Sequence, residues 1–326
     1  MRCSRCSQSA VWADPPLCKD HYASWFEGRV GETIRMYKLF SKRDRVAVAC
    51  SGGKDSTALL FVLKRLGYDV TALAVDEGIA GYRDRTLSDL KRFCEKNKIP
   101  LKIVSFRKEY GSELDVMLTR KELHPCTVCG TFRRQLLNKA ARGFDVLATG
   151  HNADDESQAV LMNLCRANTA LFTRIGPLTT SDTKNSVALE PVRGPSAGDA
   201  AKRRGSLLGR SLLRVQRAEA LHGFVRKVKP LYFLTEKECL TYALLHGLAT
   251  EWNECPYAPR AYRNDVRAAL LAYERAHPGA RERVLRHFLT VKDRLPSGAT
   301  RAVPCASCGE PSTSGRCKAC RLRAEI

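Results

Sequence analysis

The chain has 326 residues, 44% of them hydrophobic, so it can bury the core of a main domain and carry small modules besides. No run approaches the ~20 apolar residues of a membrane span, and the first residues lack the apolar core of a signal peptide. We therefore expect a cytoplasmic protein with no membrane partner. Lysine and arginine outnumber aspartate and glutamate by 55 to 34, and this excess favours a polyanionic partner, for which nucleic acid fits best.

The first 25 residues carry two close pairs of metal-type ligands. Two residues separate Cys3 from Cys6, and after eleven further residues Cys18 and His21 repeat that spacing. Two chelating pairs joined by a loop suit a tetrahedral structural zinc ion. We predict an N-terminal zinc finger over residues 1–25, with redox-active or free thiols as the alternative.

A helix is predicted over residues 26–45, followed by a strand ending at Ala49 and Cys50 and by the turn SGGKDS. The apolar spacing after this turn predicts a second helix. Backbone N–H groups of such a turn, together with the dipole of the following helix, favour a phosphate. The candidate phosphate-binding residues are Ser51, Gly52, Gly53, Lys54 and Ser56.

This turn is not a Walker A loop, which would need glycine at Val48 and a hydroxyl residue at Asp55. The string SGGxDS instead resembles the PP-loop of the adenylating ATP pyrophosphatases. That family cleaves ATP between its α- and β-phosphates and activates a carbonyl oxygen as an adenylate. The alternative is an ordinary glycine turn between a strand and a helix.

Further strands are predicted at Val70–Val75, Leu101–Phe106 and Asp145–Thr149, with a helix over residues 86–98. Strands alternating with helices predict a doubly wound α/β domain with a mostly parallel sheet. Ligands of such sheets bind beyond the carboxyl ends of the strands. Val75 could therefore offer backbone groups to an adenine ring, while Asp76 is a candidate for ribose or magnesium, or a solvated loop acid.

Cys126 and Cys129 form a C-x-x-C pair with no second pair nearby, and a helix is predicted directly after them. Arg133 and Arg134 would then lie in its first turn, where positive charge opposes the helix dipole, so we expect them to serve a ligand. The pair alone leaves redox chemistry, half a zinc site and chance open.

The strand ending at Thr149 is followed by Gly150 and the sequence HNADDE, which opens another helix. Asp154 and Asp155 would cap the free N–H groups of that helix. Capping is compatible with magnesium binding beside the phosphates.

A basic insertion is predicted at about residues 190–225. From Arg193 to Lys229 the chain has ten lysines and arginines against two acidic residues. A loop and helix that clamp nucleic-acid phosphates, or a flexible solvated insertion, would both fit. The next predicted elements are a strand at Val228–Phe233 and helices over 235–250 and 262–294, the latter broken at Pro278-Gly279.

The chain closes on four cysteines with zinc-knuckle spacing. They are Cys305, Cys308, Cys317 and Cys320. We predict a C-terminal zinc finger over residues 301–326, so that residues 26–300 form the catalytic domain.

Several motifs occur in one order that resembles the tRNA 2-thiouridine synthases, the TtuA/Ncs6 family of PP-loop enzymes. They are the N-terminal ligand set, SGGKDS, CTVCG, TGHNADDE, KPLY, ECPYA and the four-cysteine knuckle. The similarity spans nearly the whole chain. It implies a [4Fe–4S] cluster on Cys126, Cys129 and Cys255 with one iron open to sulfide; from the residues alone, Cys255 would be a buried structural cysteine.

The resemblance also implies the ATP-binding positions Ala49, Cys50, Ser51, Asp55, Val75, Arg133, Gly150 and Asp155. Lys54 and Arg133 would stabilise charge on the transferring phosphoryl group, and Asp155 would act in magnesium binding or proton handling. Family members of the ribothymidine type carry lysine at the position of Arg133. Arginine keeps the charge but does not readily act as a base, so we expect charge stabilisation there.

The implied reaction is adenylation of uridine O2 by Mg-ATP in a flipped base, followed by sulfur transfer to C2. We predict uridine 54 of the tRNA T-loop as the target, with wobble uridine 34 as the alternative. The implied cofactors are ATP, Mg²⁺, the [4Fe–4S] cluster and two zinc ions, and the implied partners are tRNA, a ubiquitin-like thiocarboxylate sulfur carrier and a second copy. Competing classes are amidating PP-loop enzymes, tRNA-lysidine synthases and zinc-dependent RNA-binding modules without catalysis.

Overall fold

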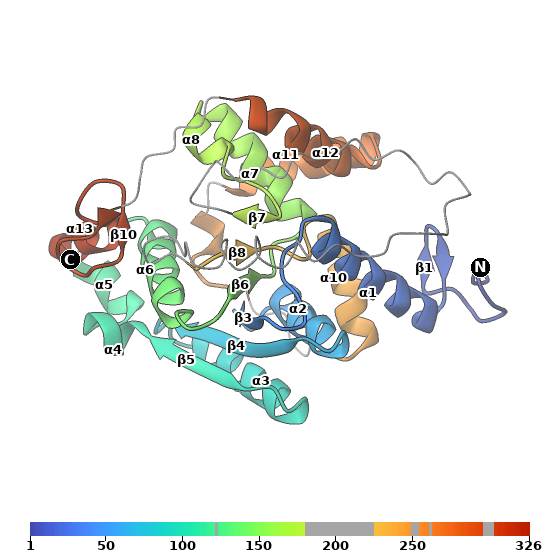
Figure 1. The fold of residues 1–326 in the computed structure, drawn as a ribbon, viewed down its shortest axis with the longest axis horizontal. Coiled ribbons are helices and arrows are strands. Elements are labelled where there is room, and N and C mark those ends of the chain that lie inside the picture. The colour runs from blue at the N-terminus through green and yellow to red at the C-terminus, as the bar shows by residue number, and fades with distance from the viewer. Residues whose placement is uncertain (121–122, 180–224, 249–253, 261–262, 296–302) are drawn as a thin grey trace, which may run out of the picture.

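The computed structural model describes residues 1–120, 123–179, 225–248, 254–260, 263–295 and 303–326. A six-stranded sheet in the order β5-β4-β3-β6-β8-β7 organises this part of the chain (Figure 1). Five strands run parallel and β7 pairs antiparallel with β8, which confirms the predicted α/β class. In sheet order the strands are Leu101–Ser105, Asp69–Asp76, Arg45–Ala49, Val146–Thr149, Lys227–Val228 and Leu178–Thr179.

Helices cover both faces of this sheet. Along β3, Val46 and Val48 belong to one apolar cluster and Ala47 to another, because successive side chains of a strand point to opposite faces. The first face is covered by α1, α2, α3 and α10, and the second by α6. The bounds of these helices are Lys19–Met36, Lys54–Arg65, Arg83–Lys96, Glu236–Leu245 and Pro125–Ala140.

A further helical layer lies beyond the β7 side of the sheet (Figure 1). Helices α7, α11 and α12 pack together there, with the short α8 beside them. They span Ala153–Cys165, Arg263–Ala276, Ala280–Val291 and Thr169–Phe172. The predicted break at Pro278-Gly279 is confirmed, with Gly279 at a φ of +80° between α11 and α12.

Several predicted boundaries were wrong. The helix predicted at 26–45 is α1, which starts seven residues earlier at Lys19 and ends at Met36. The strand predicted at Val228–Phe233 is only Lys227–Val228, since the chain turns directly afterwards. Helix α6 begins at Pro125, so the C-x-x-C pair itself occupies its first turn and Arg133 lies in its middle. The argument that Arg133 opposes a helix dipole is therefore wrong.

Small hairpin modules stand at the two ends of the molecule (Figure 1). At the N-terminus β1 and β2 (Trp12–Ala13, Pro16–Leu17) precede α1; at the C-terminus β9 and β10 (Val303–Pro304, Pro311–Ser312) precede α13 (Lys318–Glu325). The proposed domain boundaries stay predictions, and the basic insertion at about 190–225 lies outside the described residues apart from Val225. Within the described ranges, none of the helices is long and apolar enough to cross a bilayer.

The C-terminal module docks on α6. Gln135 donates to the Cys308 thiol sulfur at 3.4 Å, and Asn138 donates to a carboxylate oxygen of Glu310 at 3.0 Å. Arg142 forms an ion pair with the same carboxylate. The helix that begins with Cys126 and Cys129 is therefore anchored at its far half by the last module of the chain. The short helices α4 (Phe106–Tyr110) and α5 (Leu114–Arg120) lie between β5 and α6 in the chain.

Strands β3 and β6 mark the point where the strand order reverses. The chain leaves β3 toward β4 and β5 and returns on the other side of β3 as β6, and ligands of doubly wound sheets bind at such a point. Gly150 directly follows β6, and a Cβ placed there would lie 2.9 Å from the backbone nitrogen of Ser56. Only glycine lets the end of β6 approach the start of α2 this closely.

Substituting Gly150→Ala should therefore lower the free energy of unfolding by about 1–3 kcal/mol, because the new methyl group meets backbone rather than a movable side chain. Urea denaturation followed by circular dichroism measures this change. Gly31→Ala in α1 is the matched control, since a Cβ there meets nothing within 4 Å. It should raise stability by about 0.5–1 kcal/mol. Equal effects of the two substitutions would contradict the close approach at Gly150.

Candidate active site

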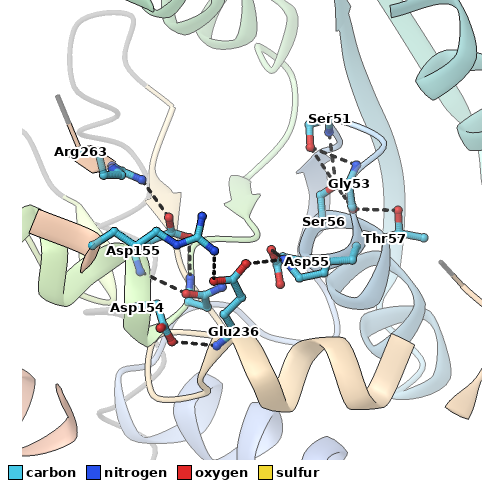
Figure 2. Close-up of polar contacts among 12 residues, drawn as sticks. Ser51, Gly53, Asp55, Ser56, Thr57, Asp154, Asp155, Glu236 and Arg263 are labelled. Atoms are coloured by element: carbon cyan, nitrogen blue, oxygen red, sulfur yellow. Dashed lines mark hydrogen bonds and ion pairs between the residues drawn. The ribbon is translucent and has the colours of Figure 1, made fainter. Parts of the chain in front are cut away.

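The turn between β3 and α2 is held in shape by its own hydroxyl groups (Figure 2). Ser51 Oγ accepts from the backbone N–H of Gly53 at 3.2 Å, while Ser56 Oγ accepts from the N–H of Ser51 at 3.3 Å and donates to the carbonyl of Gly53 at 2.9 Å. Gly52 has a φ of +85°, and a Cβ there would lie 2.7 Å from the carbonyl oxygen of Thr86. The result is a preformed glycine turn at a helix N-terminus, an arrangement that fits phosphate.

Four carboxylates and several cations gather beside this turn. Asp55, Asp154, Asp155 and Glu236 come from α2, α7 and α10, and Figure 2 shows them close together. Lys54 Nζ lies 2.8 Å from Glu236 and 3.1 Å from Asp55. The remaining ion pairs join Arg263 to Asp155 at 2.8 Å, Arg267 to Glu236 at 3.1 Å, and Arg281 to Asp154.

The predicted capping of α7 by Asp154 and Asp155 holds in part. Asn152 is the N-cap, and its side chain accepts from the N–H of Asp155 at 3.1 Å. Asp155 completes the capping box by accepting from the N–H of Asn152 at 3.3 Å. Asp154 instead accepts from the backbone N–H of Glu236 at 2.8 Å, which ties α7 to the start of α10.

Burial changes the protonation of this group. It raises the pKa of the Asp55 carboxyl to about 6, although the ammonium of Lys54 acts in the opposite direction. Burial also acts to lower the pKa of Lys54, but Asp55 and Glu236 outweigh it and raise that pKa. Lys54 is therefore a firmly charged ammonium, and Asp55 titrates within reach of neutral pH.

A cavity of about 220 Å³ opens among these side chains. Its walls include the carboxylates of Asp55 and Asp155 and the guanidinium groups of Arg263 and Arg267. Carboxylates beside a phosphate-binding turn are the ligands that Mg²⁺ uses together with substrate phosphates. The cavity and its donor set thus fit a magnesium-bound polyphosphate.

The three cysteines of the predicted cluster lie on the same side of the fold. Cys126 and Cys129 occupy the first turn of α6, and Cys129 and the half-buried Cys255 pack in one apolar cluster. Cys126 Sγ lies 3.8 Å from the carbonyl oxygen of Tyr257. The three sulfur atoms are not within 4.8 Å of one another, so they do not form a single-ion site. A [4Fe–4S] cluster binds each thiolate through a different iron atom, so it does not require the three sulfurs to meet at one ion.

A buried carboxylate connects these cysteines with the nucleotide turn. Glu77, just beyond β4, pairs with Arg83 Nε at 2.9 Å and with Arg133 Nε at 2.7 Å. Arg133 Nη2 donates to Cys129 Sγ at 2.8 Å. Arg83 donates to the carbonyl oxygens of Ser51 and Val75. The Val75 carbonyl is thus bound to an arginine; its predicted contact with adenine stays a prediction.

Both terminal ligand sets have the geometry of a tetrahedral zinc site. Within each set the four ligand atoms lie within 4.8 Å of one another, and a tetrahedron with Zn–S bonds of ~2.3 Å has edges of about 3.7 Å. Cys6 and Cys18 sulfurs are 3.6 Å apart, and those of Cys308 and Cys317 are 3.7 Å apart. The N-terminal set is Cys3, Cys6, Cys18 and His21; the C-terminal set is Cys305, Cys308, Cys317 and Cys320.

The structure adds residues that the sequence did not reveal. Glu236 pairs with Lys54, and Arg263 pairs with Asp155, although each pair is more than 100 positions apart in the chain. A signal for Glu236 existed, because it lies at the start of the helix predicted over 235–250, where the structure has Thr235 as the N-cap. Glu77 was visible only as an acid at the end of a strand. Nothing in the sequence marked Arg83 or Arg263.

Comparisons with known proteins agree with this site. Residues 26–274 match the model of the PP-loop domain. Over its full length the chain resembles tRNA-5-methyluridine(54) 2-sulfurtransferase of Pyrococcus horikoshii, with 33% identity covering 99% of this chain and 93% of that protein. Cytoplasmic tRNA 2-thiolation protein 1 of Danio rerio is 35% identical, covering 99% and 87% respectively.

Among solved structures, the U34-tRNA thiolase NcsA from Methanococcus maripaludis with its [4Fe–4S] cluster superposes with a TM-score of 0.76. It is 26% identical, and the match covers 100% of this chain and 96% of that one. The fold and the glycine turn define a PP-loop nucleotide-binding protein. Within that class, the chain belongs to the family of tRNA 2-thiouridine synthases.

The pKa of Asp55 gives a test of the site by stability. Its folded pKa of about 6 lies above the ordinary aspartate value of 3.8, so the native state binds the extra proton and stability falls as pH rises from about 4 to 6. Asp55→Asn removes this penalty. The variant should exceed the parent protein by about 1–3 kcal/mol in unfolding free energy at pH 8 and match it near pH 4. Denaturant titrations at both pH values measure the difference; a constant gap would contradict it.

Proposed function

We propose that this protein catalyses ATP-dependent 2-thiolation of a tRNA uridine, at position 54 of the T-loop, with wobble position 34 as the alternative. The observation that carries the proposal is the full-length match to a tRNA-5-methyluridine(54) 2-sulfurtransferase, combined with a preformed phosphate turn and with Cys129, which Arg133 links to Glu77. The alternative is supported by the solved U34-tRNA thiolase, which has the same fold.

The turn and its neighbours would carry the adenylation. Backbone N–H groups at Ser51, Gly52 and Gly53 and the hydroxyl of Ser56 would bind phosphate oxygens, alongside Ala49, Cys50, Val75 and Gly150 as further contacts. Lys54, released from Glu236, would stabilise the charge that develops when uridine O2 attacks the α-phosphorus and pyrophosphate departs. Asp55 and Asp155 would hold Mg²⁺, whose charge supports the same transfer.

Cys126, Cys129 and Cys255 would hold a [4Fe–4S] cluster, which when bound would supply an iron position that accepts sulfide. Arg133 lies between Cys129 and the nucleotide turn, so its guanidinium can stabilise negative charge on AMP as it leaves C2. Arginine holds its protons too firmly to act as a base. The uridine must be flipped out of its stack to reach this site.

The further partners are also proposals. tRNA follows from the relatives' names and from the net charge of +21. A ubiquitin-like carrier ending in a thiocarboxylate would deliver the sulfur, and two copies of the chain would form a homodimer.

The two terminal sets would each hold one structural zinc ion. Desolvation raises the pKa of Cys3 and Cys305, but hydrogen bonds from backbone N–H groups outweigh it and lower the pKa of each to about 6. The lower pKa favours the thiolates that zinc binds.

Thiolation in vitro tests the reaction and its target. Protein purified anaerobically should be brown, absorb near ~400 nm, and convert a tRNA transcript to 2-thiouridine with Mg-ATP and sulfide, as measured by nucleoside mass spectrometry. A transcript with cytidine at position 54 should give no product. Loss of product with cytidine at position 34 instead would establish the wobble alternative, and a colourless, inactive protein would contradict thiolation altogether.

Two substitutions probe the site within this assay. Lys54→Ala should lower kcat by about 100-fold or more, because a transition-state charge loses its partner. Cys255→Ala should remove the absorbance and the product together. Cys165→Ala is the matched control, since this cysteine is exposed at the end of α7 and belongs to none of the three cysteine sets. Retained absorbance in Cys255→Ala would contradict its place in the cluster.

Zinc content tests the terminal modules. Plasma emission spectrometry should find about two zinc ions per chain and about one in Cys18→Ser, because the remaining three ligands bind the ion much less tightly. The same substitution should lower the melting temperature, since metal binding supplies folding energy to so small a module. Two retained zinc ions in this variant would argue against the N-terminal site.

A further inference from the structure

Glu77 is a buried ion-pair centre at the carboxyl edge of the sheet. Its side chain is 5% exposed, and that of Arg83 is 3% exposed. Each of its two oxygens faces a different arginine, Oε2 toward Arg83 and Oε1 toward Arg133. Charges in such a place are tolerated only when they are paired. The two contacts of Glu77 are ion pairs rather than aligned hydrogen bonds, and through them the three side chains constrain one another's positions.

Arg83 connects Glu77 with the nucleotide turn. Beyond Glu77, its guanidinium donates to the carbonyl oxygens of Ser51 and Val75 and to Thr86 Oγ1, the last at 3.2 Å. Ser51 opens the phosphate turn and Val75 lies near the end of β4. The planar guanidinium thus braces two strand ends from inside, and its orientation depends on Glu77.

Arg133 connects Glu77 with Cys129. Its Nε faces Glu77, and its Nη2 donates to Cys129 Sγ. The side chain is 42% exposed, so the group sits at the edge between the buried carboxylate and solvent. A guanidinium with a carboxylate at its Nε and a sulfur at its Nη2 has a defined orientation relative to the thiol.

We propose that Glu77 is a positioning residue for both halves of the site, holding the Ser51 carbonyl through Arg83 and the Cys129 sulfur through Arg133. This inference rests on the proposed function for the identity of the two ligands. Because one carboxylate fixes both arginines, displacement of either one shifts the other. Nucleotide binding and the cluster's electronic environment are then energetically coupled, and by linkage the coupling is reciprocal.

Binding and spectroscopy test this without turnover. The probe for the turn is the non-cleavable analogue α,β-methylene ATP with Mg²⁺, measured by calorimetry; the probe for the cysteines is the electron paramagnetic resonance spectrum of the reduced, reconstituted cluster. Glu77→Gln should raise the Kd of the analogue about tenfold, or about 1.4 kcal/mol, and shift the g-values. In the parent protein the analogue itself should shift the g-values, and in the variant this response should be lost.

Two single-arm variants separate the halves. Arg83→Lys keeps the charge but loses the planar fork, so it should weaken the analogue strongly and shift the spectrum of the cluster only to the smaller extent that Glu77 transmits. Arg133→Lys should change the spectrum. Glu27→Gln is the matched control: Glu27 in α1 also bridges two side chains, accepting from Arg65 of α2 at 2.6 Å and from Tyr242 of α10 at 2.8 Å, and contacts neither Arg83 nor Arg133. It should alter neither readout.

The proposal is overturned if Glu77→Gln changes only one readout, or if Glu27→Gln changes both. Should Glu77→Gln not fold, Glu77→Asp serves in its place, because it keeps the buried charge while its shorter side chain cannot reach both arginines. These readouts need no tRNA. A protein that fails to thiolate tRNA yet shows the paired shifts would contradict the proposed function alone, and an active protein without them would contradict only the role of Glu77.

Discussion

The close approach of two chain segments at the sheet's switch point is the constraint on which the site depends. Gly150 ends one strand against the backbone of Asp55 and Ser56, at the start of α2. This contact places the acids that open α7 beside the phosphate turn, although about 100 residues separate them in the chain. The carboxylates, the cavity and the ion pairs with α11 all follow from the meeting of these two segments.

Charge in this site is balanced locally and by different partners on each side. Toward the cavity, the carboxylates of Asp155 and Glu236 hold Arg263, Arg267 and Lys54. Toward the cysteines, Glu77 holds Arg83 and Arg133. In the first group an entering polyphosphate can replace the carboxylates as the partner of the cations. In the second group, Arg83 is bound to backbone carbonyls and so acts as scaffold, whereas Arg133 is held beside the Cys129 thiol.

The sequence predicted the elements better than their ends, and the ligands better than the contacts between them. The apolar run before SGGKDS and its alternation with helices predicted the parallel sheet, since hydrophobic period and topology rules are local or nearly so. The start of α6 was missed because Pro125 suits the first helical turn as well as a loop. The ion pairs of Arg83 and Arg263 join remote segments, so no local pattern contains them.

The cysteines also show that local sequence patterns do not reveal contacts between remote segments. The two terminal sets are recognisable because each closes within a short stretch, and the structure brings each together. Cys255 packs in the same apolar cluster as Cys129 although more than 120 positions separate them, and only the resemblance to a family suggested that they share a site. A metal site whose ligands are close in the sequence can be predicted from their spacing. A site built from distant segments can be predicted only when the fold is known.

Anchoring of α6 by the last module has a mechanical consequence. The helix carries Cys126 and Cys129 at one end and receives Gln135, Asn138 and Arg142 contacts to the terminal hairpin further along. Because α6 is fixed in its C-terminal half, its N-terminal end cannot tilt freely. Any movement of the two thiols relative to the phosphate turn must also move the C-terminal hairpin. This hairpin therefore limits how far Cys126 and Cys129 can shift.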